Sequence, residues 1–397
     1  MKHTSLEKRM AVLFLVTVIL SFSVSAKENG KLLRTPPHAN PDIIRGIECL
    51  YNWKFEKAGE FFERIIRKNP HEPAGYFYRS MVIWSRMAAG FWSAETIEEY
   101  NNSIELTISV AKERIERDKA DSTAYFYLGG ALGFKGRLQL MQHKFFSSYL
   151  VSRDAIDALN TCLKMEPENR DILLGLGIYD YYTSRLSGVL RFLSNIFFHK
   201  GDRHEGLRKL HVAANEAMYS FLEAKSVLLY IYLFLESDFT KARPLAEELA
   251  EKFDGCPKYG YLKGVTYIKL GMNPHYRQTV DYLYRRSRID SSPIDSSIWR
   301  SWGRYLEVSY FLSHDRYEAA ISILNDILNH KDPLHNPYMS AWPLLKLGMV
   351  CDIKGEREKA LEYYRNVLNM HNAAGAQFLA EKFIRRAALR QDPLLFL

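Results

Sequence analysis

Four side chains that could bind a metal ion lie close together in the sequence: His199, Asp202, His204 and Glu205. Imidazole nitrogens and carboxylate oxygens are common zinc ligands, but this spacing matches none of the standard ligand sets. A turn that precedes a helix also collects Asp and Glu, because acidic side chains are stabilised at the positive end of the helix dipole. We therefore expect these residues to begin a helix, and we expect neither a metal nor another cofactor.

The sequence contains none of the short patterns that mark common catalytic sites. No G-x-S-x-G nucleophile motif, no glycine loop that cradles phosphate and no H-E-x-x-H zinc motif occurs. This indicates a protein that is not an enzyme. A helical toroid that acts on carbohydrates through paired carboxylates remains an alternative.

Tyrosines are frequent on the segments expected to line a groove. Asp180 stands in the run Tyr179-Asp180-Tyr181-Tyr182, where it is either a buried anchor for tyrosine hydroxyls or a ligand contact. Tyrosine suits a binding groove because its ring is large and fairly rigid and carries a polar tip. The candidate groove residues, some of them expected in the core, are Tyr76, Tyr78, Tyr125, Tyr127, Tyr179, Asp180, Tyr182, Tyr230, Tyr261 and Tyr267.

A repeated pattern of small and aromatic residues indicates the elements that position these side chains. The same offsets occur near both ends of the chain, as Gly46, Ala58 and Phe62 and again as Gly348, Ala360 and Tyr364. Small residues at such spacings mark where the two helices of a repeat of about 34 residues touch, so the chain resembles the tetratricopeptide superfamily. The resemblance implies an all-α, right-handed superhelical solenoid of about eight antiparallel helix pairs. It also implies a protein or peptide partner in the concave groove.

Turn residues and apolar periodicity give the expected extent of the helix pairs. Helix pairs are expected at 42–68, 74–118, 124–167, 223–253, 258–288, 298–329 and 341–370, with a capping helix at 376–390. A further pair, the fourth in order, has its first helix at 171–186 and a second helix that begins at Gly201-Asp202. Two irregularities interrupt this series. The connection at residues 88–92 is unusually long, and about 14 extra residues around 138–149 are expected to form an extended helix or a loop.

The first 26 residues have the pattern of a secretory signal peptide. A basic start with Lys8 and Arg9 precedes an apolar run at 11–20, and small residues stand at 24–26. We expect cleavage after Ala26 and a periplasmic or secreted protein. An uncleaved N-terminal membrane anchor is the alternative.

The rest of the chain is expected to be one large domain. A polar leader at 27–41 is followed by the solenoid at 42–397, with a possible division near 170–205. The formal net charge of +8 is mild for 397 residues, and no arginine cluster is interleaved with aromatic residues. Nucleic acid is therefore not an expected partner. The sequence does not indicate an oligomeric state.

The four cysteines are not expected to form disulfides. Cys49 and Cys351 each lie three residues after a repeat glycine, where a small apolar side chain packs inside a helix pair. They would also lie near opposite ends of a solenoid, too far apart to be joined. No C-x-x-C spacing occurs, so zinc and haem attachment are not indicated either.

A narrower resemblance covers residues 172–207. The segments 175–179, 187–193 and 201–207 are similar to a block in the inclusion-body clearance family of tetratricopeptide proteins, with its G-D-R-x-x-G-L helix start at Gly201. Eukaryotic members of that family are treated as adaptors, some at mitochondrial or lipid surfaces. Ser187 and Gly188 stand where the family tends to have prolines, so we do not carry over its location or partners.

An apolar segment at residues 189–198 lies between the two helices of the fourth pair. Its apolar side chains are flanked by Arg and Lys, a composition that fits either filler on the concave side of a solenoid or an interfacial contact. The candidate membrane or partner contacts are Val189, Arg191, Phe192, Ile196 and Phe198. A membrane-surface assembly factor docked through this segment is therefore a second alternative function.

Overall fold

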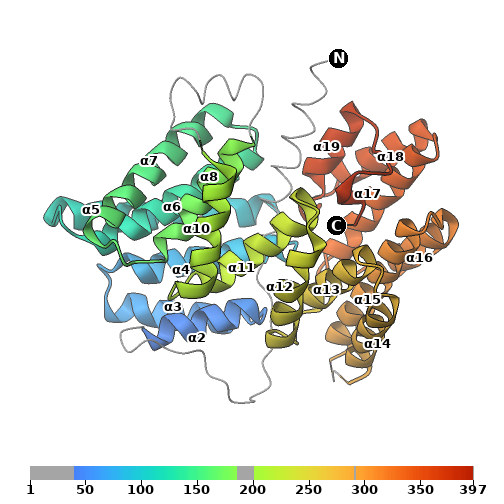
Figure 1. The fold of residues 1–397 in the computed structure, drawn as a ribbon, viewed down its shortest axis with the longest axis horizontal. Helices are drawn as coiled ribbons and strands as arrows, with labels where there is room; N and C mark the ends of the chain where they lie inside the picture. The colour runs from blue at the N-terminus through green and yellow to red at the C-terminus, as the bar shows by residue number, and fades with distance from the viewer. Residues whose placement is uncertain (1–39, 186–200, 290–291, 397) are drawn as a thin grey trace. The chain divides into compact units, whose positions relative to one another are not determined.

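The fold is helical throughout the part of the chain that the structure describes. A computed structural model describes residues 40–185, 201–289 and 292–396. Within these ranges no β-strand occurs, and helices that follow one another in the chain pack side by side (Figure 1). The all-α class predicted from the sequence is therefore confirmed. The expected signal peptide at 1–26 lies outside the described residues.

The chain divides into two compact units, each of which is described by itself. Of the described residues, 40–85 and 95–228 form the first unit, and 86–94 and 229–396 form the second. The division after Leu228 falls inside a helix rather than in a loop. Residues 170–205, where the sequence suggested a possible division, belong to the first unit as far as they are described.

The first unit is built from helices that pair with their neighbours in sequence. These are α2 (Pro41–Tyr51), α3 (Phe55–Lys68), α4 (Pro73–Ala88), α5 (Ala94–Arg117), α6 (Ser122–Met141), α7 (Phe145–Met165), α8 (Ile172–Ser184), α10 (Arg203–Glu216) and most of α11 (Phe221–Tyr230). The extra residues around 138–149 form no separate element. They lengthen α6 and α7, which are joined by a tight turn in which His143 has a positive φ of 59°.

The second unit continues with the same neighbour-to-neighbour packing. Its elements are η1 (Ile231–Leu235), α12 (Phe239–Lys252), α13 (Pro257–Lys269), α14 (Asn273–Ile289), α15 (Pro293–Ser313), α16 (Tyr317–Asn329), α17 (Tyr338–Ile353), α18 (Arg357–Leu368), α19 (Gln377–Arg385) and η2 (Pro393–Phe396). The expected capping helix ends earlier than residue 390. Arg357 donates to the carbonyls of Phe383 and Ile384, and Asp352 accepts the backbone N–H of Ala388, so neighbouring side chains bind the last backbone groups.

Glycines allow the two helices of a pair to touch, as the repeat pattern predicts. A Cβ added at Gly348 would lie 2.5 Å from a ring carbon of Tyr364, and one at Gly46 would overlap the ring of Phe62. Both aromatic rings are fully buried. The offsets read from the sequence therefore correspond to the same helix-to-helix contact in the two units.

The long connection between α4 and α5 is a packed element of the second unit. Gly90 has a φ of +114°, a conformation that favours glycine, and lies against the backbone of Tyr338. The backbone N–H of Trp92 donates to Asn372 Oδ1 at 3.1 Å, and its ring meets that of Phe378 edge-on at 5.6 Å. The extra length of this connection is thus used to pack against α17 and the start of α19.

Candidate functional site

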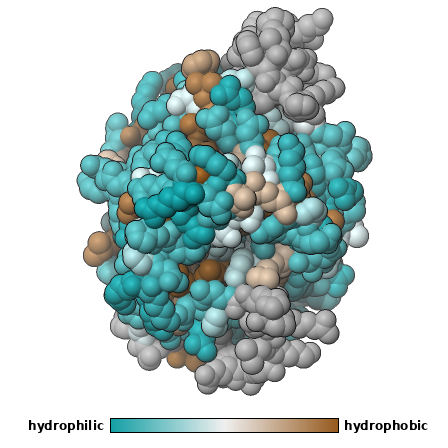
Figure 2. All heavy atoms as spheres, turned by 90° about the vertical axis from the view of Figure 1, so that its left-hand side faces the viewer, coloured by the Kyte–Doolittle hydropathy of each residue, from teal (hydrophilic) through white to brown (hydrophobic). Residues whose placement is uncertain are grey.

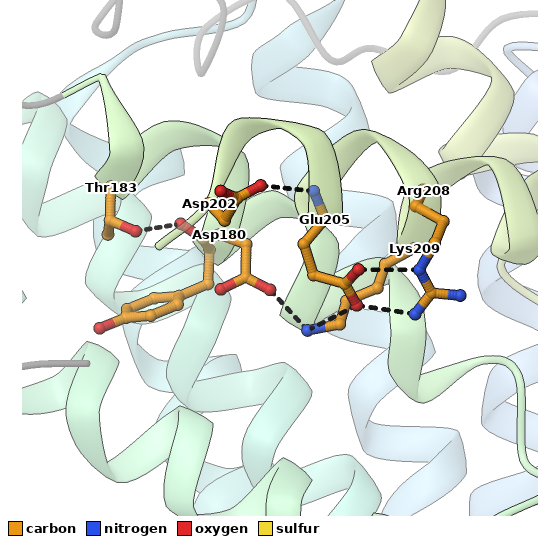
Figure 3. Close-up of polar contacts among 7 residues, drawn as sticks. Asp180, Thr183, Asp202, Glu205, Arg208 and Lys209 are labelled. Carbon is orange, nitrogen blue, oxygen red and sulfur yellow. Dashed lines mark hydrogen bonds and ion pairs between the residues drawn. The ribbon is translucent and has the colours of Figure 1, made fainter. Parts of the chain in front are cut away.

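The acidic residues of the fourth helix pair tie two helices together. Asp180 on α8 accepts a hydrogen bond from Lys209 Nζ on α10 at 2.6 Å (Figure 3). Asp202 Oδ1 accepts the backbone N–H of Glu205 at 2.8 Å and so caps the start of α10. The Glu205 carboxylate binds the guanidinium of Arg208 at 2.7 Å, a contact that lowers the pKa of Glu205.

These contacts give two of the four candidate metal ligands, Asp202 and Glu205, a structural role. Asp202 and Glu205 are engaged in the cap and the ion pairs, while His199 lies outside the described residues. Within the described ranges no group of three His, Cys, Asp or Glu side chains is placed to hold a metal ion. Asp180 is a helix-to-helix tie with a lysine rather than an anchor for tyrosine hydroxyls.

Most of the candidate groove tyrosines are core residues. Tyr78, Tyr127, Tyr182, Tyr230, Tyr261 and Tyr267 are buried. Tyr76, Tyr125 and Tyr179 are half-buried, and the hydroxyl of Tyr76 donates to the carbonyl of Pro70 at 3.0 Å. Of the ten candidates, Tyr261 is the one that binds the backbone of the C-terminal turn, which is described below.

The apolar segment at 189–198, expected as a membrane or partner contact, lies outside the described residues. It contains all five candidate contacts, Val189, Arg191, Phe192, Ile196 and Phe198. In the described part of the chain, no helix has the length and apolarity needed to cross a membrane. The face shown in Figure 2 is largely hydrophilic, with apolar residues scattered over it.

A buried acid, Glu223, and a half-buried base, Arg137, lie in the first unit. Glu223, in the first turn of α11, is 7% exposed and accepts a hydrogen bond from the hydroxyl of Tyr51 at 3.3 Å. Burial raises the pKa of Glu223 to about 7, although the charge of Arg137 opposes this shift. Burial also lowers the pKa of Arg137 to about 10, and its guanidinium lies 4.9 Å from the centroid of the Trp84 ring.

Several buried polar atoms of the first unit lack a hydrogen-bond partner among the described residues. Glu223 Oε1 and the hydroxyls of Tyr100 and Tyr182, three groups that act on the charge of Arg137, are buried and have no hydrogen-bond partner among the described residues. An unsatisfied buried polar atom costs about 1–3 kcal/mol, and a carboxylate costs more than a hydroxyl. The interior of the first unit is therefore suited to hold Glu223 in its neutral form at acidic pH.

The second unit holds its own C-terminal turn against the first helices of its pairs. This turn, η2, has two backbone carbonyls bound by buried side chains from α13 and α17. The hydroxyl of Tyr261 donates to the carbonyl of Phe396 at 2.8 Å, and Lys346 Nζ donates to the carbonyl of Leu395 at 2.9 Å. Figure 1 marks this end of the ribbon among the helices of the second unit. We call Tyr261, Lys269, Tyr305, Ser309 and Lys346 the tail site, and Pro393–Phe396 the tail.

Two lysines lie in the apolar and aromatic surroundings of the tail site. Lys346 is 1% exposed, and its Nζ lies 4.4 Å from the centroid of the Tyr305 ring. Lys269 Nζ lies 3.3 Å from the centroid of the Phe396 ring. Burial lowers the pKa of Lys269 to about 8 and that of Lys346 well below its ordinary value, to which the charge of Lys269 also contributes.

Aromatic side chains complete the wall behind the tail. The ring of Tyr261 lies 5.3 Å from that of Trp302 and 5.4 Å from that of Tyr305. Ser309 Oγ lies 2.9 Å from the hydroxyl of Tyr261, which donates its proton to the tail and so accepts from Ser309. Tyr261 is thereby oriented toward the tail by a neighbouring hydroxyl.

A cavity of about 230 Å³ adjoins the tail. Leu233, Phe234, Val265 and Leu312 contribute apolar wall, and Phe396 of the tail forms another side. Asp315, which also lines the cavity, forms an ion pair with Arg390 just before the tail. The tail therefore fills only part of the space available at this face.

Sequence reasoning identified Tyr261 but missed the other tail-site residues. A signal for one of them is present, since Lys346 is the single charged residue in the otherwise apolar stretch from Tyr338 to Cys351. The tail itself shows another, as Pro393, Leu395 and Phe396 make a short apolar run after a segment rich in charge. Neither pattern reveals that the two segments meet.

Two comparisons with known proteins found nothing similar to this chain. A scan against protein-family models found no match, and a search of the curated proteins found none.

Proposed function

We propose that this chain is an exported, non-catalytic helical-repeat scaffold of the tetratricopeptide kind, which binds a peptide segment of a protein partner at the tail site. One observation carries the proposal: an apolar segment, the tail, lies there with two main-chain carbonyls bound by Tyr261 and Lys346. A surface that recognises main-chain acceptors and buries apolar side chains has the chemistry of a peptide-binding site.

The repeat pattern supports this proposal independently of the tail. Solenoids of stacked helix pairs present the first helices of successive pairs on one face, and such faces bind extended partners. Tyr261, Tyr305 and Lys346 come from α13, α15 and α17, which are the first helices of three successive pairs. The export part of the proposal rests on the pattern of residues 1–26 alone.

Site-specific photocrosslinking in the source cells tests the proposal. A benzophenone amino acid replaces Ser313, which lines the cavity beside the tail. The matched control carries it at Glu362, an exposed position on α18. We expect discrete crosslinked protein species at position 313 that are absent at 362 and that disappear when Tyr261→Phe and Lys346→Met are added.

The alternative functions predict different results. If both positions give the same crosslinks and the purified chain hydrolyses members of a glycan panel, the scaffold proposal is wrong and the carbohydrate-active alternative is favoured. If the crosslinks at position 313 persist when Tyr261→Phe and Lys346→Met are present, the partner binds at a face other than the tail site.

A further inference from the structure

The tail site recognises the tail partly through groups that every peptide has. Tyr261 and Lys346 bind backbone carbonyls, at 2.8 and 2.9 Å, and neither contact depends on the side chains that the tail carries. Selectivity for the sequence of the bound segment comes instead from the two tail side chains that are buried in the tail site. Leu395 is 1% exposed, and Phe396 is 7% exposed with its ring beneath the Lys269 ammonium.

The segment before the tail is held by contacts of its own. Lys382 Nζ forms an ion pair with Asp392 Oδ2 at 3.1 Å, and both side chains are largely shielded from water. Further back, Ala388 is bound to Asp352 on α17 at 2.8 Å. The segment before Pro393 is therefore held by contacts that do not depend on the tail.

Resting on the proposed function, we infer that the tail is a resident competitor at its site. The ligand that the geometry points to is a segment of a partner protein in which an aliphatic residue is directly followed by an aromatic one, within a single helical turn. This partner binds by displacing the tail, so the chain restrains its own binding site until a better ligand arrives.

The cavity beside the tail explains how a partner segment outcompetes an attached one. Its volume of about 230 Å³ exceeds the roughly 150 Å³ of an apolar cavity that accommodates benzene. A partner segment that reproduces the tail contacts and places one more apolar side chain against Leu233, Val265 and Leu312 gains contacts that the tail does not make.

Competition by the attached tail raises the apparent dissociation constant of a free peptide by a factor that can be measured. The apparent dissociation constant equals the intrinsic one divided by the fraction of molecules in which the site is vacant. A tail that occupies its site in 90–99% of molecules therefore weakens the binding of a free peptide by about 10- to 100-fold.

Peptide binding to three forms of the full chain tests the inference. The probe is a fluorescein-labelled peptide with the sequence of residues 391–396, its two ends capped so that no terminal charge contributes. The tail variant carries Leu395→Ala and Phe396→Ala, and the site variant adds Tyr261→Phe and Lys346→Met to it. Fluorescence anisotropy should show binding to the tail variant at least about tenfold tighter than to the wild type, and binding to the site variant should be lost.

A matched peptide and a folding check accompany the measurement. A probe with Ala in place of both Leu395 and Phe396 should not bind the tail variant. Circular dichroism establishes that each form is folded. Should the double substitution prevent folding, Phe396→Leu replaces it, because this change keeps an apolar side chain at the position.

Two outcomes would overturn the inference. Equal affinity of the wild type and the tail variant would mean that the tail does not compete. A folded tail variant that fails to bind the probe would reject the ligand class, and the position-specific crosslinks at Ser313 would show separately whether the proposed function survives.

A third outcome concerns a second copy of the chain as the occupant. If copies exchange tails, light scattering would show the wild type dimerising with increasing concentration while the tail variant stays monomeric. That result would assign the site to another copy of the chain and overturn its assignment to a separate partner.

Discussion

Burial determines the direction in which the pKa values of Glu223 and Arg137 are shifted in the first unit. Glu223 keeps a raised pKa even though Arg137 attracts its charged form, because removal of water costs the carboxylate more than this attraction returns. Arg137 is affected in the opposite direction for the same reason, since burial lowers its pKa to about 10. The pair therefore contributes a dependence of stability on pH.

The sign of this dependence follows from the direction of the shift in Glu223. Its pKa is 4.5 in the unfolded chain and about 7 in the folded one, so the folded state binds the proton more tightly. The stabilisation is fully present below pH 4.5 and is lost as pH rises through 7. We expect the free energy of unfolding to fall by about 3 kcal/mol across this window, as measured by urea unfolding at a series of pH values.

Glu223→Gln should remove this slope, because the amide does not titrate. The control is Glu60→Gln, at an exposed position of α3, which should leave the slope unchanged. An unaltered slope in Glu223→Gln would show that another group is responsible.

Single residues were the least predictable part of the molecule. The type and spacing of the candidate tyrosines placed them on the correct helices, yet burial was decided by the neighbouring helices and put Tyr78, Tyr127 and Tyr230 in the core. Glu223 and Lys346 escaped attention because each lies in a helix that is mostly apolar, where a few charged residues hardly change the pattern. Whether such a charge points into the protein depends on rotamers and neighbours that the sequence does not encode locally.

Helices and their pairing were predictable at the scale of elements. The offsets around Gly46 and Gly348 describe a direct contact between a small residue and an aromatic ring, so they can be read without knowing the rest of the fold. The end of α19 could not be predicted in the same way. It depends on Arg357 and Asp352, which bind backbone groups of residues 383–388 from a neighbouring helix pair.

The contact at Gly46 makes a prediction for the stability of the first helix pair. In Gly46→Ala the new methyl group meets the ring of Phe62, which is fully buried and stacked on Tyr78 at 5.2 Å. Because the ring cannot easily move, we expect a loss of about 1–3 kcal/mol in the free energy of unfolding, measured by chemical denaturation.

A second glycine of the same helix pair provides the matched control. A Cβ at Gly59 on α3 would meet nothing within 4 Å. Gly59→Ala should therefore stabilise the chain by about 0.5–1 kcal/mol through helix propensity alone. If both substitutions stabilise, the close contact inferred at Gly46 does not exist.

At the scale of the whole molecule, the sequence predicted the all-α class but not the division into two units. Neighbouring helix pairs look alike in sequence whether or not they belong to the same compact unit. The boundary after Leu228 lies inside α11, and no Gly, Pro or polar linker marks it. The exported location and the tetratricopeptide relationship remain predictions from the sequence.

The cysteines allow a prediction about the oxidised and reduced protein. No disulfide links Cys49, Cys162, Cys256 and Cys351, all of which lie in the described part of the chain. Cys162 is fully buried, and burial raises the pKa of its thiol to about 12, which disfavours the reactive thiolate. The melting temperature should therefore be the same with and without dithiothreitol. A decrease of many degrees on reduction would reveal a structural disulfide.

The connection at residues 89–93, between α4 and α5, completes its packing late in folding. Trp92 bonds to Asn372, a partner 280 residues further along the chain, whereas the helix pairs are stabilised by neighbours in sequence. Bringing such distant residues together costs more loop-closure entropy than forming a helix pair. The contact between Trp92 and Asn372 is therefore expected to form after the helix pairs. As the polypeptide emerges during synthesis, α4 and α5 can form early, but the segment between them can pack only after almost the entire remaining chain has been made.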